Sequence, residues 1–335
     1  MKSVVFLDDL KESDIRPEKM YDEYKELLRQ DTLKYFSDHS LLVKVACPGC
    51  LNKNSKGVFK KDGFNYCICD KCGSFFVSPR PSDEALRDFY KNSRAGIFLR
   101  KKFLTNTLES RSKNIFSYRI QWITGLVEEY APSAKVFLDY GTRYPTFMKE
   151  LDNTGIFSSF FSVKPEYFGQ EDLLPKNVKT AEAKCIFKED IDVFAAFEIV
   201  ERVFSPRELF RQASAACRKG GLFIITSATS SGFEYQVLKE HSPNIIAPDR
   251  LNILALEALT NQIEKSGFEI IEVSTPGRLD VEIVKRVYEK NPGIPLDSFW
   301  KYIFNNRDAN ALHSFQEYLQ QFRLSSHVRI AAIKK

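Results

Sequence analysis

The sequence predicts an α/β protein built on a doubly wound parallel sheet, preceded by a helical segment and a metal-binding module. In residues 134–151, a strand-like run passes through a turn containing Gly141 into a segment with apolar residues at helical spacing, which is typical of the first βα unit of a nucleotide-binding sheet. Strands alternate with helices from there to about residue 273, and this alternation implies parallel strand order. Two Cys-x-x-Cys pairs upstream indicate the separate metal-binding module.

The composition is that of a globular protein with more than one module. The 335 residues suit one large α/β domain with smaller additions, and the hydrophobic and charged fractions of 43% and 28% are ordinary. No apolar run approaches the roughly 18 residues that span a bilayer, and the first apolar patch lacks a cleavage site, so we expect a cytoplasmic protein without a membrane span or signal peptide. The net charge of +5 is small for this length, which argues against a nucleic-acid partner.

We expect four parts along the chain. They are an N-terminal helical segment (1–45), the metal-binding module (46–82), a helical connector (83–131) and the sheet domain (132–335), which contains a helical insert at about 281–322. In the first part, Pro17 stands where a first helical turn tolerates proline, and apolar residues recur at helical spacing over residues 16–38. We interpret this helix as a packed collar and not as part of a site.

The strongest local signal is a pair of cysteine motifs. They are Cys47-Pro-Gly-Cys50 and Cys69-Asp-Lys-Cys72, with eighteen residues between them. Four thiolates at this spacing are typical of a tetrahedral Zn²⁺ site, and four protein ligands leave no open coordination position, so the predicted zinc is structural. The intervening residues 58–68 fit the hairpin of a zinc ribbon, with its turn at Asp62-Gly63.

Cys67 offers an alternative ligand in this ribbon. It lies two positions before Cys69, and alternate residues of a strand share a side, so either thiol could complete the zinc site. We favour Cys69, because its spacing from Cys72 repeats the spacing of the first pair.

Residues 94–119 are strongly basic, with seven Lys or Arg against the single acid Glu109. The basic residues are Arg94, Arg100, Lys101, Lys102, Arg111, Lys113 and Arg119. Two readings are open: a solvated helix face, or a surface that attracts an anionic substrate such as a nucleotide-linked sugar.

A family resemblance emerges after the cysteine motifs. The run Phe-Phe-Val-Ser-Pro-Arg-Pro-Ser (75–82), with Ser82 as the N-cap of a helix ending in Phe89-Tyr90, resembles the entry into a family of bacterial class I S-adenosylmethionine (SAM) methyltransferases. That family carries an N-terminal zinc ribbon, and many members are tied to sugar modification and surface-polysaccharide synthesis. Residues 198–206 and 218–226 resemble its segment after the fourth strand and its double-glycine turn with the fifth strand. The resemblance implies a Rossmann-like methyltransferase sheet of seven strands, whose last strand, 327–335, is antiparallel and lies between the fifth and sixth.

The resemblance also implies where SAM would bind. The cofactor would contact the turn after the first strand. The family has an acid at the end of the second strand, and Lys164 stands at that position in this sequence. The turn residues are Asp139, Tyr140, Gly141 and Thr142.

Several residues depart from the family pattern at this site. Arg143 and Pro145 stand where the family has glycines, and Lys164 cannot accept hydrogen bonds from the ribose hydroxyls. The sequence therefore predicts that SAM binds too weakly to measure at ordinary protein concentrations. Glu166 could instead supply the ribose acceptor, and basic residues in the pocket could suit an anionic ligand.

Glu198, Glu201 and Arg202 are the candidate catalytic residues. Two glutamates three residues apart on a helical turn fit a general-base pair or, alternatively, a solvated face, and Arg202 stands where the family commonly has histidine.

These observations favour a SAM-dependent methyltransferase-like protein that acts on a small-molecule or nucleotide-sugar substrate in sugar or surface-polysaccharide biosynthesis. The alternative is a catalytically inactive pseudo-methyltransferase that has lost SAM and serves as a binding or scaffold partner of another enzyme. A nucleic-acid-binding module would draw on the ribbon and the basic segment, but the otherwise balanced charge disfavours it.

Overall fold

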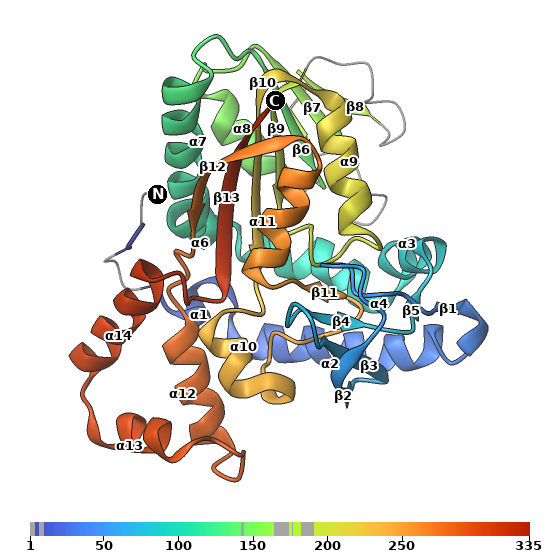
Figure 1. Cartoon of the computed structure of the whole chain (residues 1–335), viewed down its shortest axis with the longest axis vertical. Helices are drawn as coiled ribbons and strands as arrows, with labels where there is room; N and C mark the ends of the chain where they lie inside the picture. Colours follow the sequence, from blue (N-terminus) through green and yellow to red (C-terminus); the bar gives the residue numbers. More distant parts are fainter. Residues whose placement is uncertain (1–3, 7–9, 142–143, 164–173, 176, 182–190) are drawn as a thin grey trace.

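The computed structural model describes residues 4–6, 10–141, 144–163, 174–175, 177–181 and 191–335. Within them, seven strands form one sheet in the order β8-β7-β6-β9-β10-β13-β12 (Figure 1). The strands are β6 (Val136–Tyr140), β7 (Ser159–Val163), β8 (Val178–Ala181), β9 (Ile191–Phe197), β10 (Cys217–Ala228), β12 (Phe268–Ser274) and β13 (His327–Lys334). β13 is antiparallel to both of its neighbours, whereas β6 to β10 are parallel to one another. The predicted doubly wound sheet, with its last strand antiparallel between the fifth and sixth, is confirmed.

The central strands are apolar on both sides because helices cover both faces of the sheet. All seven residues of β9 are buried. Val193 belongs to a core cluster on one face, and its neighbour Phe194 belongs to the cluster on the other. The helices are α7 (Ser117–Tyr130) and α8 (Pro145–Asp152) on the Val193 face, and α9 (Pro206–Ala216) and α11 (Leu256–Lys265) on the Phe194 face.

The chain before the sheet is mainly helical. Its helices are α1 (Glu12–Ile15), α2 (Glu18–Tyr35), α3 (Asp83–Asn92), α4 (Arg94–Phe98), α5 (Leu104–Asn106) and α6 (Leu108–Arg111), with a 3₁₀ turn at His39–Leu41 and π-helical stretches at Leu99–Phe103 and Ser112–Phe116. The predicted helix after Pro17 is present as α2. Ser82 Oγ accepts a hydrogen bond from the Ala85 N–H at 3.1 Å and thereby caps α3 as predicted.

The cysteine-rich module is a small antiparallel sheet, ordered β11-β4-β3-β2. Its strands are β2 (Ser55–Lys61), β3 (Phe64–Cys69), β4 (Phe75–Val77) and β11 (Asn252–Ile253). The predicted hairpin turn at Asp62 and Gly63 has φ angles of 48° and 87°, the left-handed values that a type I′ turn requires. β11 comes from the C-terminal half of the chain, so this module is completed by a distant segment.

Arg80 fastens the module to the large domain. It lies on β5 (Arg80–Pro81), which pairs with β1 (Leu42–Val43), and its side chain is fully buried. The guanidinium donates to the Val77 carbonyl at 2.9 Å, to Asn252 Oδ1 at 2.8 Å and to the Phe204 carbonyl at 3.0 Å. Burial lowers the pKa of Arg80 to about 10, so it remains charged at neutral pH.

The remaining helices follow β10 and β12 in the chain. They are α10 (Phe233–Leu238), α12 (Asp280–Lys290), α13 (Ser298–Asn306) and α14 (Ala309–Gln321), with a 3₁₀ turn at Lys239–His241. The last three form the lower left part of the molecule in Figure 1 and correspond to the predicted helical insert. None of the helices in the described part of the chain is both long and apolar enough to cross a lipid bilayer.

Candidate functional site

A cavity of about 280 Å³ lies at the carboxyl ends of three neighbouring strands, where Gly141, Glu198 and Ala228 line it. Parallel α/β sheets bind ligands at this edge, because the loops that follow the strands are free to form a crevice there. Figure 1 shows α2 crossing the same end of the sheet.

The N-terminal helices form part of the cavity wall. Tyr21 and Tyr24 of α2 line it, together with Phe103 and Leu104 from the connector. The helix predicted at 16–38 does pack as a collar, but the expectation that it takes no part in a site is wrong for this cavity. Its apolar face does pack on the core, but the same aromatic side chains also close the cavity.

The turn after β6 brings two of the predicted cofactor residues to the cavity. Asp139 and Gly141 line it, and Gly141 has a φ of 87°, which favours glycine. Tyr140 points to the opposite side of the strand, where it stacks on Phe194 at 5.7 Å between ring centroids. Burial raises the pKa of Tyr140 to about 12.

Other predicted cofactor-site residues, Thr142, Arg143, Lys164 and Glu166, lie outside the described residues. Pro145 is described and begins α8, where the missing N–H of proline leaves no helical hydrogen bond unmade.

Glu198 follows β9 with a φ of 58°, and its side chain enters the cavity. Its Oε1 accepts a hydrogen bond from Thr226 Oγ1 at 2.9 Å and lies 3.6 Å from Nδ1 of His327. Burial alone would raise the pKa of Glu198, but the nearby His327 and Arg119 outweigh it, so the pKa lies below its ordinary value. Burial lowers the pKa of His327, although Glu198 acts in the opposite direction. The pair at neutral pH is therefore a carboxylate beside a neutral imidazole.

Glu201 does not line the cavity. Its carboxyl group is fully buried, accepts a hydrogen bond from Ser227 Oγ at 3.0 Å and has its other oxygen 3.2 Å from Arg202 Nη1. Burial and the neighbouring Glu198 raise the pKa of Glu201. Residues 198–202 form a turn and not the helical face expected from the sequence, so the two glutamates point to different environments.

Arg202 lines the cavity but is held by a bidentate ion pair. Its Nε and Nη2 donate to the two carboxylate oxygens of Asp249 at 3.0 and 3.1 Å. Burial lowers the pKa of Arg202, but Asp249 and Glu201 outweigh that effect and raise it.

The basic segment divides between scaffold and cavity. Arg94 pairs with Asp31 at 2.7 Å, and Lys102 pairs with Glu23 at 2.9 Å, so these two residues fasten the connector to α2. Arg119, in contrast, lines the cavity, with its guanidinium 4.2 Å from the centre of the Phe197 ring. Arg111 also lines the cavity.

Most cavity residues were not proposed as site residues from the sequence, and His327, Arg250 and Glu234 are examples. His327 begins β13, and the other two lie on the segment between β10 and β11. The four histidines of the chain are scattered in sequence, so spacing gave no signal for His327.

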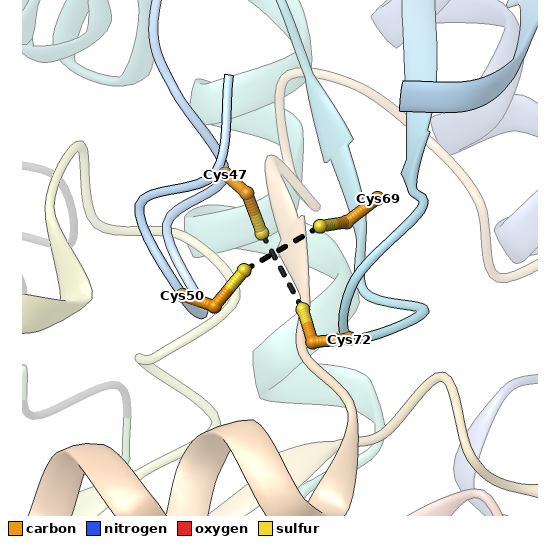
Figure 2. Close-up of side chains that lie close together, drawn as sticks. All are labelled: Cys47, Cys50, Cys69 and Cys72. Atoms are coloured by element: carbon orange, nitrogen blue, oxygen red, sulfur yellow. Dashed lines mark hydrogen bonds between the residues drawn. The ribbon is translucent and has the colours of Figure 1, made fainter. Parts of the chain in front are cut away.

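A second candidate site is the cysteine cluster of the small sheet. The sulfur atoms of Cys47, Cys50, Cys69 and Cys72 all lie within 4.8 Å of one another. Figure 2 shows them pointing toward a common centre, with separations of 3.6 Å between Cys47 and Cys72 and 3.5 Å between Cys50 and Cys69. Cys67 is outside the cluster, and its thiol faces the Ser78 carbonyl.

The similarity of this chain to known proteins lies in its fold and not in its sequence. No protein-family model matches the chain, and no curated protein is significantly similar in sequence. Among solved structures, it is similar to geranyl diphosphate C-methyltransferase from Streptomyces coelicolor A3(2), at 13% identity and a TM-score of 0.45, over 76% of this chain and 99% of that one. It is also similar to a SAM-dependent methyltransferase from Thermotoga maritima, at 15% identity and a TM-score of 0.43, over 69% and 97%. A third is phosphoethanolamine N-methyltransferase 2 from Haemonchus contortus, at 14% identity and a TM-score of 0.45, over 83% and 71%. At these levels of similarity, the matches say nothing of the substrate or activity of this chain.

Proposed function

We propose that the protein is a SAM-dependent methyltransferase with a structural zinc ribbon. The observation that carries this proposal is the placement of the cavity: it lies at the carboxyl ends of β6, β9 and β10, with Asp139 and Gly141 of the predicted cofactor turn in its wall. The substrate class, a nucleotide-linked sugar or related small molecule of sugar or surface-polysaccharide biosynthesis in the cytoplasm, is supported by the family resemblance of the sequence.

The residues of the β6 turn fit SAM, which carries a positive sulfonium group, a positive ammonium group and a negative carboxylate. The Asp139 carboxylate would accept hydrogen bonds from it, and the positive φ of Gly141 lets the backbone approach. Arg119 would hold its carboxylate: in the described structure the guanidinium makes no hydrogen bond, and its nearest acid, Glu198, is 4.0 Å away. When bound, SAM supplies an electrophilic methyl group.

The Glu198–His327 pair is the proposed catalytic base. Nδ1 of His327 faces Glu198, which leaves Nε2 available to take a proton from the methyl acceptor. The lowered pKa of His327 keeps the imidazole neutral near pH 7, as a base must be.

The cysteine cluster is proposed to bind one Zn²⁺. Four sulfurs around a tetrahedral zinc at about 2.3 Å are separated by roughly 3.8 Å, close to the separations of 3.5 and 3.6 Å found here. All four positions would be filled by protein, so the metal would stabilise the fold and take no part in the reaction.

Ligand-observed NMR with SAM and S-adenosylhomocysteine tests the cofactor proposal. We expect saturable binding with a dissociation constant near 1 mM, about −4 kcal/mol, because Lys164 and Pro145 remove contacts of the family site. Arg119→Gln should weaken binding about tenfold, and Arg307→Gln, on the exposed face of the insert, should leave it unchanged.

Three outcomes would contradict parts of this proposal. Absence of binding at several millimolar ligand would favour the pseudo-methyltransferase alternative. A micromolar dissociation constant would show that the departures from the family pattern cost little. Equal binding by the wild type and Arg119→Gln would remove Arg119 from the site.

A further inference from the structure

Part of the cavity wall is built by the α1–α2 junction and the segment 233–250, away from the residues proposed to hold SAM. Arg16, Tyr21, Tyr235 and Arg250 line it there, with Asn244 beside them. This part of the wall contains two arginines and two tyrosine rings, together with the polar side chains of Glu234, Asn244 and Asp249. The proposed methyl transfer uses neither the arginines nor the tyrosines.

Arg250 is a buried cation with few hydrogen-bond partners in the described part of the protein. Its residue is 8% exposed, and in the described structure its guanidinium makes one hydrogen bond, from Nη1 to the Tyr235 hydroxyl at 2.7 Å. No described carboxylate lies within 4.0 Å of it. Burial lowers the pKa of Arg250, but Tyr235 and nearby acids outweigh that effect, so it stays charged.

The acids around Arg250 are engaged elsewhere. Asp249 and Glu201 both pair with Arg202, and Glu201 also accepts a hydrogen bond from Ser227. Glu198 accepts a hydrogen bond from Thr226 and faces His327. Glu234 is bound by the Asn244 amide at 2.9 Å and by the Ser242 hydroxyl. A buried guanidinium is costly unless hydrogen-bonded, so its remaining donors require a ligand or water in the cavity.

Arg16 brings a second positive charge to the same wall. Its Nη1 donates to Asn244 Oδ1 at 2.7 Å and contacts Glu12 at 3.4 Å, an acid that is shared with Arg286. Arg16 and Arg250 are close enough for each charge to oppose the other electrostatically. Two like charges that face one cavity are stabilised when an anion binds between them.

We propose that Arg250 and Arg16 form an anion-binding subsite that holds a phosphoryl or carboxylate group of the small-molecule ligand. The planar guanidinium of Arg250 offers paired N–H donors to two oxygens of such a group, and the Tyr235 hydroxyl fixes its orientation. The inference rests on the proposed function only in treating the cavity as a substrate cavity, because the anion would bind whether or not SAM does.

Inorganic phosphate and acetate are the probes that distinguish the two kinds of anion. The intact zinc-loaded protein is titrated with each at constant ionic strength, and binding is followed by thermal unfolding and calorimetry. We expect saturable binding of at least one probe, weakened about tenfold or more in Arg250→Gln and less in Arg16→Gln. Arg307→Gln, a surface control of the same chemistry, should bind as the wild type does.

Two further variants keep the test decisive if Arg250→Gln does not fold. Arg250→Lys retains the charge but not the paired donors, and Tyr235→Phe removes only the orienting hydroxyl. Both should weaken anion binding while circular dichroism remains that of the wild type. The proposal would be overturned if the wild type bound neither probe. It would also be overturned if all four cavity variants bound both probes as strongly as the wild type does.

The same samples separate this inference from the proposed function. Phosphate or acetate binding without SAM binding would retain the anion subsite and reject the methyltransferase. SAM binding that survives in Arg250→Gln, without anion binding by the wild type, would reject the subsite alone.

Discussion

Glu234 is a buried acid of the cavity wall, and its ionisation should make the stability of the protein depend on pH. The residue is 3% exposed, and its carboxylate accepts hydrogen bonds from Ser242 and Asn244. Burial raises the pKa of Glu234 to about 6, although those hydrogen bonds and Arg250 act in the opposite direction. An acid with a raised pKa binds more protons in the folded than in the unfolded state, so its contribution to stability declines as pH rises through that pKa.

Replacing Glu234 with glutamine should remove this pH dependence. As the pH rises from 5 to 7.5, the wild type must ionise a buried group and the variant need not. The free energy of unfolding of Glu234→Gln should therefore rise by about 1 kcal/mol relative to that of the wild type over this range. Urea denaturation at both pH values measures the difference. Glu240→Gln, at a more exposed neighbouring position, is the control, and a Glu234→Gln difference that does not change with pH would contradict the assignment.

Site residues were predictable where the chain itself carries a motif. The four clustered cysteines and the Asp139–Gly141 turn have local spacings that imply their chemistry. His327 and Arg250 have none, since they reach the cavity only through the pairing of β13 and the return of the chain toward β11. Glu201 lies three residues after Glu198, a spacing that would place both side chains on one face of a helix. The positive φ at Glu198 is not helical, so the two side chains do not share a face.

At the scale of elements, the cysteine module and the large domain stabilise each other. β4 pairs with β11, so Phe76 lies opposite Asn252 across the small sheet. Gln262 of α11 also donates to the backbone carbonyls of residues 48 and 49, next to the cysteine cluster. A two-residue strand such as β11 carries no periodicity, which is why the sequence did not predict this connection.

Cys50→Ser should therefore release the metal and destabilise more than the module. A structural zinc contributes directly to folding free energy, and loss of one thiolate leaves the site incomplete. We expect about one zinc per wild-type chain by metal analysis, little in the variant, and a lower unfolding temperature for the whole chain. Chelation of the wild type should have the same effect.

Cys67→Ser is the matched control, because Cys67 is in the same sheet but outside the cluster. It should keep its zinc. The proposed ligand set would be contradicted if the wild-type protein contained no zinc. It would also be contradicted if Cys67→Ser lost its zinc while Cys50→Ser kept it.

At the scale of the whole molecule, the order of the sheet was predictable and the shape of the cavity was not. Buried parallel strands are short apolar runs that can be read locally, and the family resemblance supplied the position of the last one. The cavity wall, in contrast, combines residues from Phe6 to Arg329, which approach one another only after the N-terminal helices have packed against the sheet. No local pattern encodes that packing.

The C-terminal strand makes the fold depend on the last residues of the chain. β13 pairs with β10 along Leu222–Ala228 and with β12 on its other side, so it fills an interior position in the sheet. Val328, Ile330 and Ala332 are fully buried. Its absence would leave two unpaired strand edges and an apolar gap between the fifth and sixth strands.

Truncation after Phe322 should therefore yield insoluble protein. Full burial of one large aliphatic side chain is worth roughly 1.5–3 kcal/mol, so losing Val328 and Ile330 alone removes a large share of a typical total of about 5–15 kcal/mol. The backbone hydrogen bonds to both neighbouring strands are lost as well. Solubility after expression and unfolding of any soluble fraction measure the effect, with a chain lacking only the exposed Lys335 as the control. A soluble truncation that unfolds cooperatively would show that β10 and β12 can close the sheet without β13.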